Sequence, residues 1–362
     1  MEKNIVVIEG DGVGPEIISK AIDVLKKIEQ KYSHKFNLEY VDMGGASIDK
    51  YGVPLTDENL EKCKSSDSVL LGAVGGPKWD NVLPENRPEK GLLKLRKGMG
   101  LYANIRPIKM LKPLEYASPL KDIVTKNDID FVIVRELTGG VYFGEHKFEN
   151  TNNTKKAIDI MPYDENEIKR IGKVAFEMAR KLKKPLTSVD KANVLHTSKL
   201  WREVMNNLSK EYSDIKYNDM YVDNAAMQII ANPSQFGIIV TENMFGDILS
   251  DEASVITGSI GMASSASLAD NTVGMYEPIH GSAPDIAGKD LVNPIGTILS
   301  LAMMFRHSFN LDKEAENIEN AVYKTIEEGY RTIDIMPKDK NISNLYKLVK
   351  CSEISDIIVS NI

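Results

Sequence analysis

The sequence predicts an α/β protein whose sheet is at least partly parallel and covered by helices on both faces. Short apolar runs typical of buried strands recur along the 362 residues, and helical patterns lie between several of them. No internal repeat, low-complexity segment or Pro/Ser-rich linker interrupts the alternation, so any domain boundary is a point where the chain crosses between lobes.

The first predicted element is a buried strand at residues 5–8. A glycine-rich turn follows at residues 9–14, and a helix opens at Pro15, a residue that suits the first helical turn. Its apolar positions keep the helical period: Ile17, Ile18, Ala21, Ile22, Leu25 and Ile28.

Further strands and helices follow the same two patterns. A helix begins near Asp164, which could cap it together with Glu167. That helix carries Ile168, Ile171, Ala175, Met178 and Leu182 on one face, and a late helix carries Ile318, Ala321, Val322, Thr325 and Ile326. Strand-like runs occupy residues 68–71, 131–134, 186–189, 220–222 and 236–240.

Composition narrows the class of protein. Hydrophobic residues make up 42% and charged residues 27%, which is ordinary for a globular protein with a substantial core. A net charge of -7 argues against nucleic-acid and anionic-membrane partners. Two distant cysteines exclude a disulfide framework, and no apolar run reaches the roughly 20 residues of a membrane span. The start of the chain lacks a secretory signal, so we expect a cytoplasmic location.

The turn Gly10-Asp11-Gly12-Val13-Gly14 lies between a strand and a helix, as a dinucleotide fingerprint does. Its third glycine comes one residue early, and Asp11 would put a carboxylate where a phosphate should bind. The alternative to a Rossmann phosphate site is a tight turn that lines some other site, and this second interpretation is favoured.

Two acidic side chains follow the predicted strand that ends near Thr241. If a helix begins at about Phe245, Asp247 and Asp251 lie four residues apart on one face. A third carboxylate, Asp223, directly follows another apolar run. Oxygen-only ligands select Mg²⁺ or Mn²⁺, and ligands in open α/β sheets bind beyond strand ends. The alternative is a solvated acidic helix face.

Four cationic side chains and one loop are further candidates for a ligand-binding site. Arg96 and Arg106 flank residues 98–102, Arg135 ends a strand, and Lys191 follows another strand. They could converge on a dicarboxylate, or each could be an ordinary surface or ion-pairing residue. The loop at residues 280–294 is rich in small residues and could approach a flat ligand closely, or it could be an ordinary turn.

Taken together, these segments resemble the isocitrate/isopropylmalate dehydrogenase family of β-decarboxylating dehydrogenases over essentially the whole chain. Eight motifs in order carry the resemblance: GDGVGPEI (10–17), GAVGGPKWD (72–80), GLLKLRK (91–97), LYANIRP (101–107), VRELTGGVYFGE (134–145), SVDKANVL (188–195), NPSQFGIIVTENMFGDILSDEAS (232–254) and EPIHGSAPDIAGKDLVNP (277–294).

The resemblance implies roles for the candidate residues. Arg96, Arg106 and Arg135 would bind the substrate carboxylates. Lys191 would act with Asp223 to remove the C2 hydroxyl proton, and Tyr142 would protonate the enol carbon after CO2 leaves. Mg²⁺ or Mn²⁺ would be held by Asp223, Asp247 and Asp251, and Asp223 and Lys191 would come from the second subunit of a homodimer.

The resemblance also implies the cofactor site. The loop would bind the adenosine half of NAD through Gly281, Ser282, Ala283, Pro284, Asp285, Ile286 and Asn293. Gly75 and Gly76 would line the nicotinamide side. An Asp at position 285 favours NAD over NADP, since its carboxylate would repel a 2′-phosphate.

Substrate choice and architecture complete the expectations. Leu92 and Leu93 precede Arg96 by one helical turn and offer an apolar pocket, which fits the isopropyl group of 3-isopropylmalate and would leave a third carboxylate unpaired. A sibling activity on D-malate, tartrate or homoisocitrate is the alternative. The implied fold is a two-domain isocitrate/isopropylmalate dehydrogenase fold with mixed sheets flanked by helices, not Rossmann. Residues 1–101 and 258–362 would form the first domain, and residues 102–257 the second, with the dimer interface.

Overall fold

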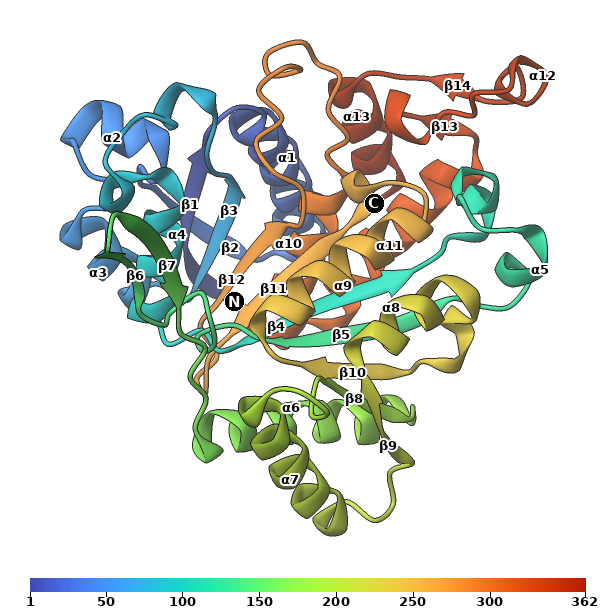
Figure 1. Ribbon diagram of the computed structural model, residues 1–362. Helices are drawn as coiled ribbons and strands as arrows, with labels where there is room; N and C mark the ends of the chain where they lie inside the picture. Colours follow the sequence, from blue (N-terminus) through green and yellow to red (C-terminus); the bar gives the residue numbers. More distant parts are fainter. The chain divides into compact units, whose positions relative to one another are not determined.

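The structure, a computed structural model, describes residues 1–362 (Figure 1). It divides into two compact units. Unit 1 contains Met1–Leu101, Met110–Pro119 and Ser254–Ile362, and unit 2 contains Tyr102–Lys109 and Leu120–Ala253. Both units combine a mixed sheet with helices, so the predicted fold class is confirmed. No helix is long and apolar enough to span a membrane.

Unit 1 joins the two ends of the chain in one sheet. Its strand order is β2-β1-β3-β12-β11, in which β1 runs parallel to β2 and β3, β3 runs parallel to β12, and β11 is antiparallel (Figure 1). The strands are β1 (Glu2–Gly10), β2 (Lys35–Tyr40), β3 (Ser68–Ala73), β11 (Ser264–Leu268) and β12 (Gly274–Pro278), with a separate parallel pair of β13 (Tyr330–Arg331) and β14 (Lys347–Leu348).

The helices of unit 1 follow the apolar periodicity of the sequence. The apolar positions predicted for the first helix are all buried on α1, which packs against α10 and α13. The helices are α1 (Gly14–Tyr32), α2 (Gly45–Tyr51), α3 (Asp57–Ser65), α4 (Pro88–Gly98), α10 (Ile295–His307), α11 (Asp312–Glu327), α12 (Lys340–Ser343) and α13 (Cys351–Asn361).

Unit 2 has a second five-stranded segment in the order β4-β5-β10-β8-β9, with β4 antiparallel to β5 and the other pairs parallel. Its strands are β4 (Ala103–Lys109), β5 (Asp130–Glu136), β8 (Leu186–Asp190), β9 (Tyr217–Tyr221) and β10 (Ile238–Thr241), and β6 (His146–Thr151) and β7 (Thr154–Asp159) form a hairpin. Its helices are α5 (Asp122–Thr125), α6 (Glu165–Leu182), α7 (His196–Glu211), α8 (Val222–Ala231) and α9 (Asn243–Ile256).

Local signals in the sequence set several of these boundaries. Asp164 accepts hydrogen bonds from the backbone of Asn166 and Glu167, and Glu167 returns one to Asp164 N, so the predicted capping box begins α6. Of the run at 220–222, residues 220 and 221 end β9 and Val222 begins α8. The strand itself starts at Tyr217, with polar residues that do not fit an apolar pattern.

Domain boundaries differ in part from those that the sequence predicts. Residues 110–119 and 254–257, expected in the second domain, pack in unit 1. The reason is visible in their contacts: the Tyr116 hydroxyl donates to Ile335 O at 2.8 Å and accepts from Arg331 Nε at 2.6 Å, and Ser118 Oγ donates to Ile256 O at 2.6 Å.

Candidate active site

The carboxylate of Asp247 is the meeting point of three predicted site residues in unit 2. Arg135 Nη1 is ion-paired to Asp247 Oδ1, Arg106 Nη2 lies 3.5 Å from the same atom, and the Tyr142 hydroxyl donates to Oδ2 at 2.6 Å. Asp251, one turn along α9, lies 3.4 Å from Arg106 Nη1. The helix thus presents both predicted metal ligands on the face that meets the two arginines.

Strand register explains why the arginines meet there. Asn104 lies opposite Arg135 across β4 and β5, and Arg106 is two residues further along β4. Cross-strand partners and alternate residues point to the same side of a sheet, so all three side chains share one face. Arg106 Nε donates to Asn104 Oδ1 at 2.7 Å, and Nη1 donates to Ser250 Oγ at 2.5 Å.

The start of α9 is held by two buried polar residues outside the predicted set. Glu242 is 4% exposed and accepts hydrogen bonds from the backbone of Met244 and Phe245, which starts the helix at Asn243 rather than near Phe245 as predicted. The Asn243 side chain contacts Arg135. A carboxylate at the beginning of a helix is favourable because it satisfies unpaired N–H groups.

Tyr142 belongs to the loop that follows β5. Arg135 lies over its ring, 5.5 Å from the centroid, and Asp247 Oδ2 accepts a hydrogen bond from its hydroxyl at 2.6 Å. Burial and the Asp247 carboxylate raise the pKa of Tyr142 to about 12. The phenol is therefore protonated at neutral pH and can act as a proton donor.

Lys191 and Asp223 form a separate pair in unit 2. Lys191 Nζ donates to Asp223 Oδ1 at 2.6 Å, and this contact holds the pKa of Asp223 below its ordinary value. The turn that bears Lys191 is fixed by Asp190, which is 1% exposed and accepts a hydrogen bond from Ala192 N at 2.9 Å and two of 2.8 Å from Arg202. The Asp190 carboxylate is therefore paired with Arg202 within unit 2.

The three predicted aspartates do not gather in a single chain. No group of three or more His, Cys, Asp or Glu side chains that could hold an ion is present. Asp247 and Asp251 lie together, whereas Asp223 pairs with Lys191. Carboxylate oxygens are the donors that Mg²⁺ and Mn²⁺ prefer, so this donor chemistry fits either ion.

Arg96 lies in unit 1, where the predicted substrate pocket residues share its helix. It is buried in the last turns of α4, and Nη2 donates to Glu277 Oε1 at 2.9 Å. Its buried Nε has no hydrogen-bond partner in the structure, which suits a ligand oxygen. Leu92 and Leu93, both partly exposed, lie one helical turn before Arg96 on α4.

The predicted cofactor loop also lies in unit 1, against the glycine turn. Val13 N donates to Ser282 O at 2.8 Å, and a side chain on Gly12, which has a φ of 58°, would overlap the same carbonyl. Glu16 accepts from Gly288 N and Asp290 N at 2.8 and 3.0 Å, so α1 supports the loop.

The residues of this loop differ in how accessible they are to a ligand. Gly281, Pro284 and Asp285 are exposed, whereas Asn293 is 4% exposed and its amide donates to Asp334 Oδ2 at 3.0 Å. Asn293 therefore braces the loop in this structure. His280, outside the predicted set, has a buried Nε2 without a partner, and burial lowers its pKa. A neutral ring with an unpaired nitrogen fits a ligand such as NAD.

Asp11 explains why the glycine turn is no phosphate site. Its carboxylate accepts from the backbone N–H groups of Gly45, Ala46 and Gly75, at 2.8, 2.9 and 2.8 Å. The side chain thus points into the protein and fixes the segment of Gly75 and Gly76, which was predicted to line the nicotinamide. Burial raises its pKa despite these bonds.

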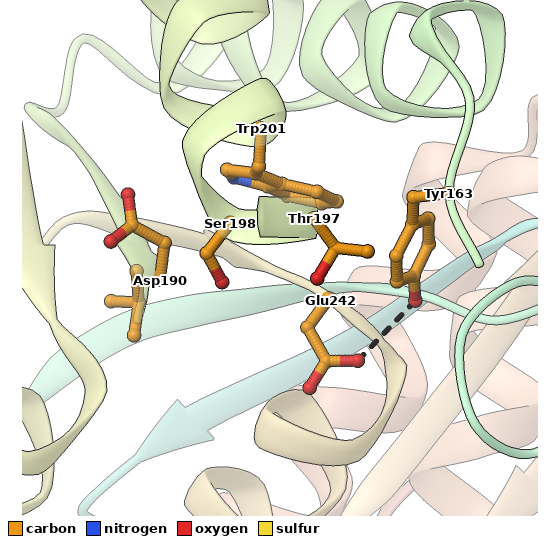
Figure 2. Close-up of a pocket in the computed structure, with 7 residues that line it drawn as sticks. Tyr163, Asp190, Thr197, Ser198, Trp201 and Glu242 are labelled. Carbon is orange, nitrogen blue, oxygen red and sulfur yellow. Dashed lines mark hydrogen bonds between the residues drawn. The ribbon is translucent and has the colours of Figure 1, made fainter. Parts of the chain in front are cut away.

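A small pocket behind α9 is lined by buried polar groups of unit 2. Figure 2 shows the Tyr163 hydroxyl directed at Glu242, 3.4 Å from Oε2, with Trp201 beside it. The same hydroxyl lies 3.3 Å from Glu136 Oε2 and accepts from Asn243 N at 3.0 Å. Burial raises the pKa of both glutamates. The hydrogen bonds of Tyr163 in this pocket hold Glu242 and Asn243 at the start of α9.

Comparison with known proteins gives a consistent result over the full length. The family model described as isocitrate/isopropylmalate dehydrogenase matches residues 4–358. A protein named 3-isopropylmalate dehydrogenase from Helicobacter hepaticus is 57% identical over 362 residues, covering 100% of both chains. One of the same name from Clostridium acetobutylicum is 56% identical, over 92% of this chain and 94% of that one.

A solved structure shares the fold at lower identity. The crystal structure of isocitrate dehydrogenase from Methylococcus capsulatus is 31% identical, covers 99% of each chain and superposes with a TM-score of 0.86. The curated relatives are therefore much more similar to this chain than that isocitrate enzyme is.

Proposed function

We propose a function from one premise: this chain belongs to the isocitrate/isopropylmalate dehydrogenase family. The proposed reaction is the NAD-dependent oxidation and decarboxylation of (2R,3S)-3-isopropylmalate to 4-methyl-2-oxopentanoate, CO2 and NADH, a step of leucine biosynthesis. The observation that carries it is identity above 50% to relatives named 3-isopropylmalate dehydrogenase, one of them matched from end to end.

The arginines bind the substrate carboxylates. Arg106 and Arg135 are held in unit 2 by asparagine partners, and Arg96 carries a buried Nε without a partner in unit 1. Guanidinium groups bind carboxylates bidentately, and buried ones do so with little competition from water. Leu92 and Leu93 on α4 give an apolar contact for the isopropyl group.

Asp223, Asp247 and Asp251 hold Mg²⁺ or Mn²⁺. A bound ion would act as a Lewis acid that stabilises negative charge on the C2 oxygen in both the oxidation and the decarboxylation. In the free chain, Arg106 and Arg135 balance the charge of Asp247. Asp247 and Asp251 both lie on the face of α9 that meets these arginines.

Proton movements are carried by a lysine and a tyrosine. Lys191, 2.6 Å from Asp223, takes the C2 hydroxyl proton as the hydride leaves for the nicotinamide of NAD. After CO2 departs, the Tyr142 hydroxyl donates its proton to C3. With a pKa of about 12, Tyr142 carries that proton at neutral pH.

NAD binds with its adenosine half at the loop beyond β12. Gly281, Ser282, Ala283, Pro284, Asp285, Ile286 and Asn293 form this loop. The exposed carboxylate of Asp285 accepts hydrogen bonds from the ribose hydroxyls. The unpaired Nε2 of His280 lies at the start of the loop, and Gly75 and Gly76 lie beside the nicotinamide.

A second copy of the chain completes each site. Within one chain, Asp223 does not join Asp247 and Asp251, which supports donation of Lys191 and Asp223 across a dimer interface. Unit 2 has apolar side chains available for such an interface, since Met227 on α8 and Ile248 on α9 are each 60% exposed.

The experiment is an NADH-formation assay on the purified chain with Mg²⁺ or Mn²⁺. The substrates are 3-isopropylmalate, isocitrate, D-malate, tartrate and homoisocitrate, each with NAD and with NADP. We expect the highest kcat/KM for 3-isopropylmalate with NAD. A higher value for another acid would assign the chain to that sibling activity, and no turnover of any acid would refute the proposal.

A further inference from the structure

One buried amide connects two parts of the site that serve different steps. Asn243, the first residue of α9, is 1% exposed. Its Oδ1 accepts from Arg135 Nε at 3.0 Å and from Arg135 Nη2 at 2.8 Å. Its Nδ2 donates to Leu137 O at 3.1 Å and to Gly139 O at 3.0 Å.

These four hydrogen bonds use the full capacity of the side chain. A primary amide has two acceptor sites on oxygen and two N–H donors. The reverse orientation of the amide would place N–H groups against a guanidinium and oxygen against two carbonyls, so the network allows only one orientation. Such a group fixes its partners more tightly than a surface hydrogen bond does.

The oxygen side of the amide sets the plane of a guanidinium. Arg135 is 2% exposed and donates to Asn243 through two different nitrogens. Because a guanidinium is planar, two bonds along one edge fix the direction in which it presents its N–H groups. A carboxylate bound by Arg135 is therefore placed in part by Asn243.

The nitrogen side holds the loop after β5. Leu137 and Gly139 lie between the end of this strand and Tyr142, and their carbonyls both point at Asn243. Loss of these bonds would release the backbone that carries Tyr142. A proton donor displaced by about 1 Å can lose on the order of 100-fold in rate.

We propose that Asn243 is a positioning residue that acts on binding through Arg135 and on proton delivery through the Tyr142 loop. The inference rests on the proposed function, in which Arg135 binds substrate and Tyr142 protonates C3. Since each side of the amide serves one step, substitutions can separate the two effects.

Two substitutions make that separation. Asn243→Ala removes all four hydrogen bonds. Asn243→Asp keeps an oxygen that can accept from Arg135 but turns a second oxygen toward the carbonyls of Leu137 and Gly139, which repel it. The matched control is Asn206→Ala on α7, which removes amide bonds to Arg202 O and Asp219 Oδ2 and leaves the four hydrogen bonds of Asn243 in place.

The readouts are kcat, KM and the dissociation constant of 3-isopropylmalate, the solvent isotope effect on kcat, and the thermal midpoint. For Asn243→Ala we expect weaker binding by about tenfold, the order of one lost charged hydrogen bond, and kcat lower by about 100-fold. For Asn243→Asp we expect binding within about threefold of the parent, a kcat as low as that of the alanine variant, and a larger solvent isotope effect.

Other outcomes overturn the proposal. If both variants lower the thermal midpoint like Asn206→Ala and leave binding and kcat unchanged, Asn243 is only structural. If the aspartate variant loses binding and kcat equally, the two sides do not act separately. Should the alanine variant not fold, Asn243→Ser replaces it with the same expectation.

A double substitution tests the route through the phenol. In a Tyr142→Phe background, Asn243→Asp should lower kcat by less than about twofold, because the donor that it displaces is already absent. A full 100-fold loss there would contradict the inference. Failure of the proposed function itself looks different, since the unaltered chain would then form no NADH from 3-isopropylmalate.

Discussion

A methyl group added at Gly246 should disturb substrate binding through Arg135. The Cβ of Gly246→Ala would lie 2.6 Å from Arg135 Cγ, 2.8 Å from its Cβ and 3.2 Å from its Cδ. Arg135 is 2% exposed and its guanidinium is tied to Asn243 and Asp247, so its stem has little room to move. The helix and the arginine must shift relative to each other.

The magnitude follows from two opposing effects. Overpacking a core position costs about 1–3 kcal/mol. Alanine favours the interior of a helix over glycine by about 1 kcal/mol. We therefore expect the free energy of unfolding to fall by roughly 0–2 kcal/mol, while KM for 3-isopropylmalate rises about tenfold, the equivalent of about 1.4 kcal/mol of binding energy.

The assay compares Gly246→Ala with Gly172→Ala. Gly172 lies in α6, where its Cβ would approach Leu208 Cδ1 and Met205 Sδ at 2.7 Å each, away from Arg135. Both variants are measured by urea unfolding and by NADH formation. A KM that is unchanged in Gly246→Ala, or raised equally in both variants, would refute the placement of Arg135 in the substrate site.

Three further predictions concern the metal, the base and pH. Asp251→Asn should raise the Mn²⁺ concentration needed for half-maximal activity by about 10–100-fold, measured by metal titration, and an unchanged requirement would remove Asp251 from the ligands. Lys191→Ala should abolish NADH formation while NAD binding by calorimetry is retained, and an active variant means that the base is elsewhere. Burial raises the pKa of Glu136 and Glu242 above the ordinary 4.5, so the folded chain holds protons that the unfolded chain releases. The free energy of unfolding should fall as pH rises from 4.5 through the raised pKa values, by up to about 1.4 kcal/mol per pH unit for each group. In urea unfolding, a variant with both Glu136→Gln and Glu242→Gln should show a weaker dependence of that free energy on pH.

Much of the fold follows from patterns that the sequence shows directly. The first helix and the Asp164 capping box are local features, and each is found where the sequence predicts it. The edge strand β9 is only partly predicted, because its polar residues conceal it. Placement of residues 110–119 with unit 1 depends on contacts such as that of Tyr116 with Arg331, which lie far apart in the chain.

The features of the site likewise divide into those that the sequence predicts and those that depend on the folded structure. Asp247 and Asp251 are predictable because helical spacing fixes their common face. Their contact with Arg106 depends on strand register, which a single sequence does not give. Glu242 and Asn243 are not predicted as site residues, because a buried polar residue is identified by its hydrogen-bond partners, which a sequence does not show. Their position between a strand and a helix is a signal that could have indicated them.

The most direct test of a site built from two copies is to mix two inactive chains. One carries Lys191→Ala and the other Asp247→Asn, and the chains are co-expressed in equal amounts and assayed with 3-isopropylmalate, NAD and Mn²⁺. If each copy completes its partner's site, half of the dimers contain one intact site, and activity should recover to about a quarter of the parent value. No recovery in a preparation shown to contain mixed dimers would mean that each site is made by one chain alone.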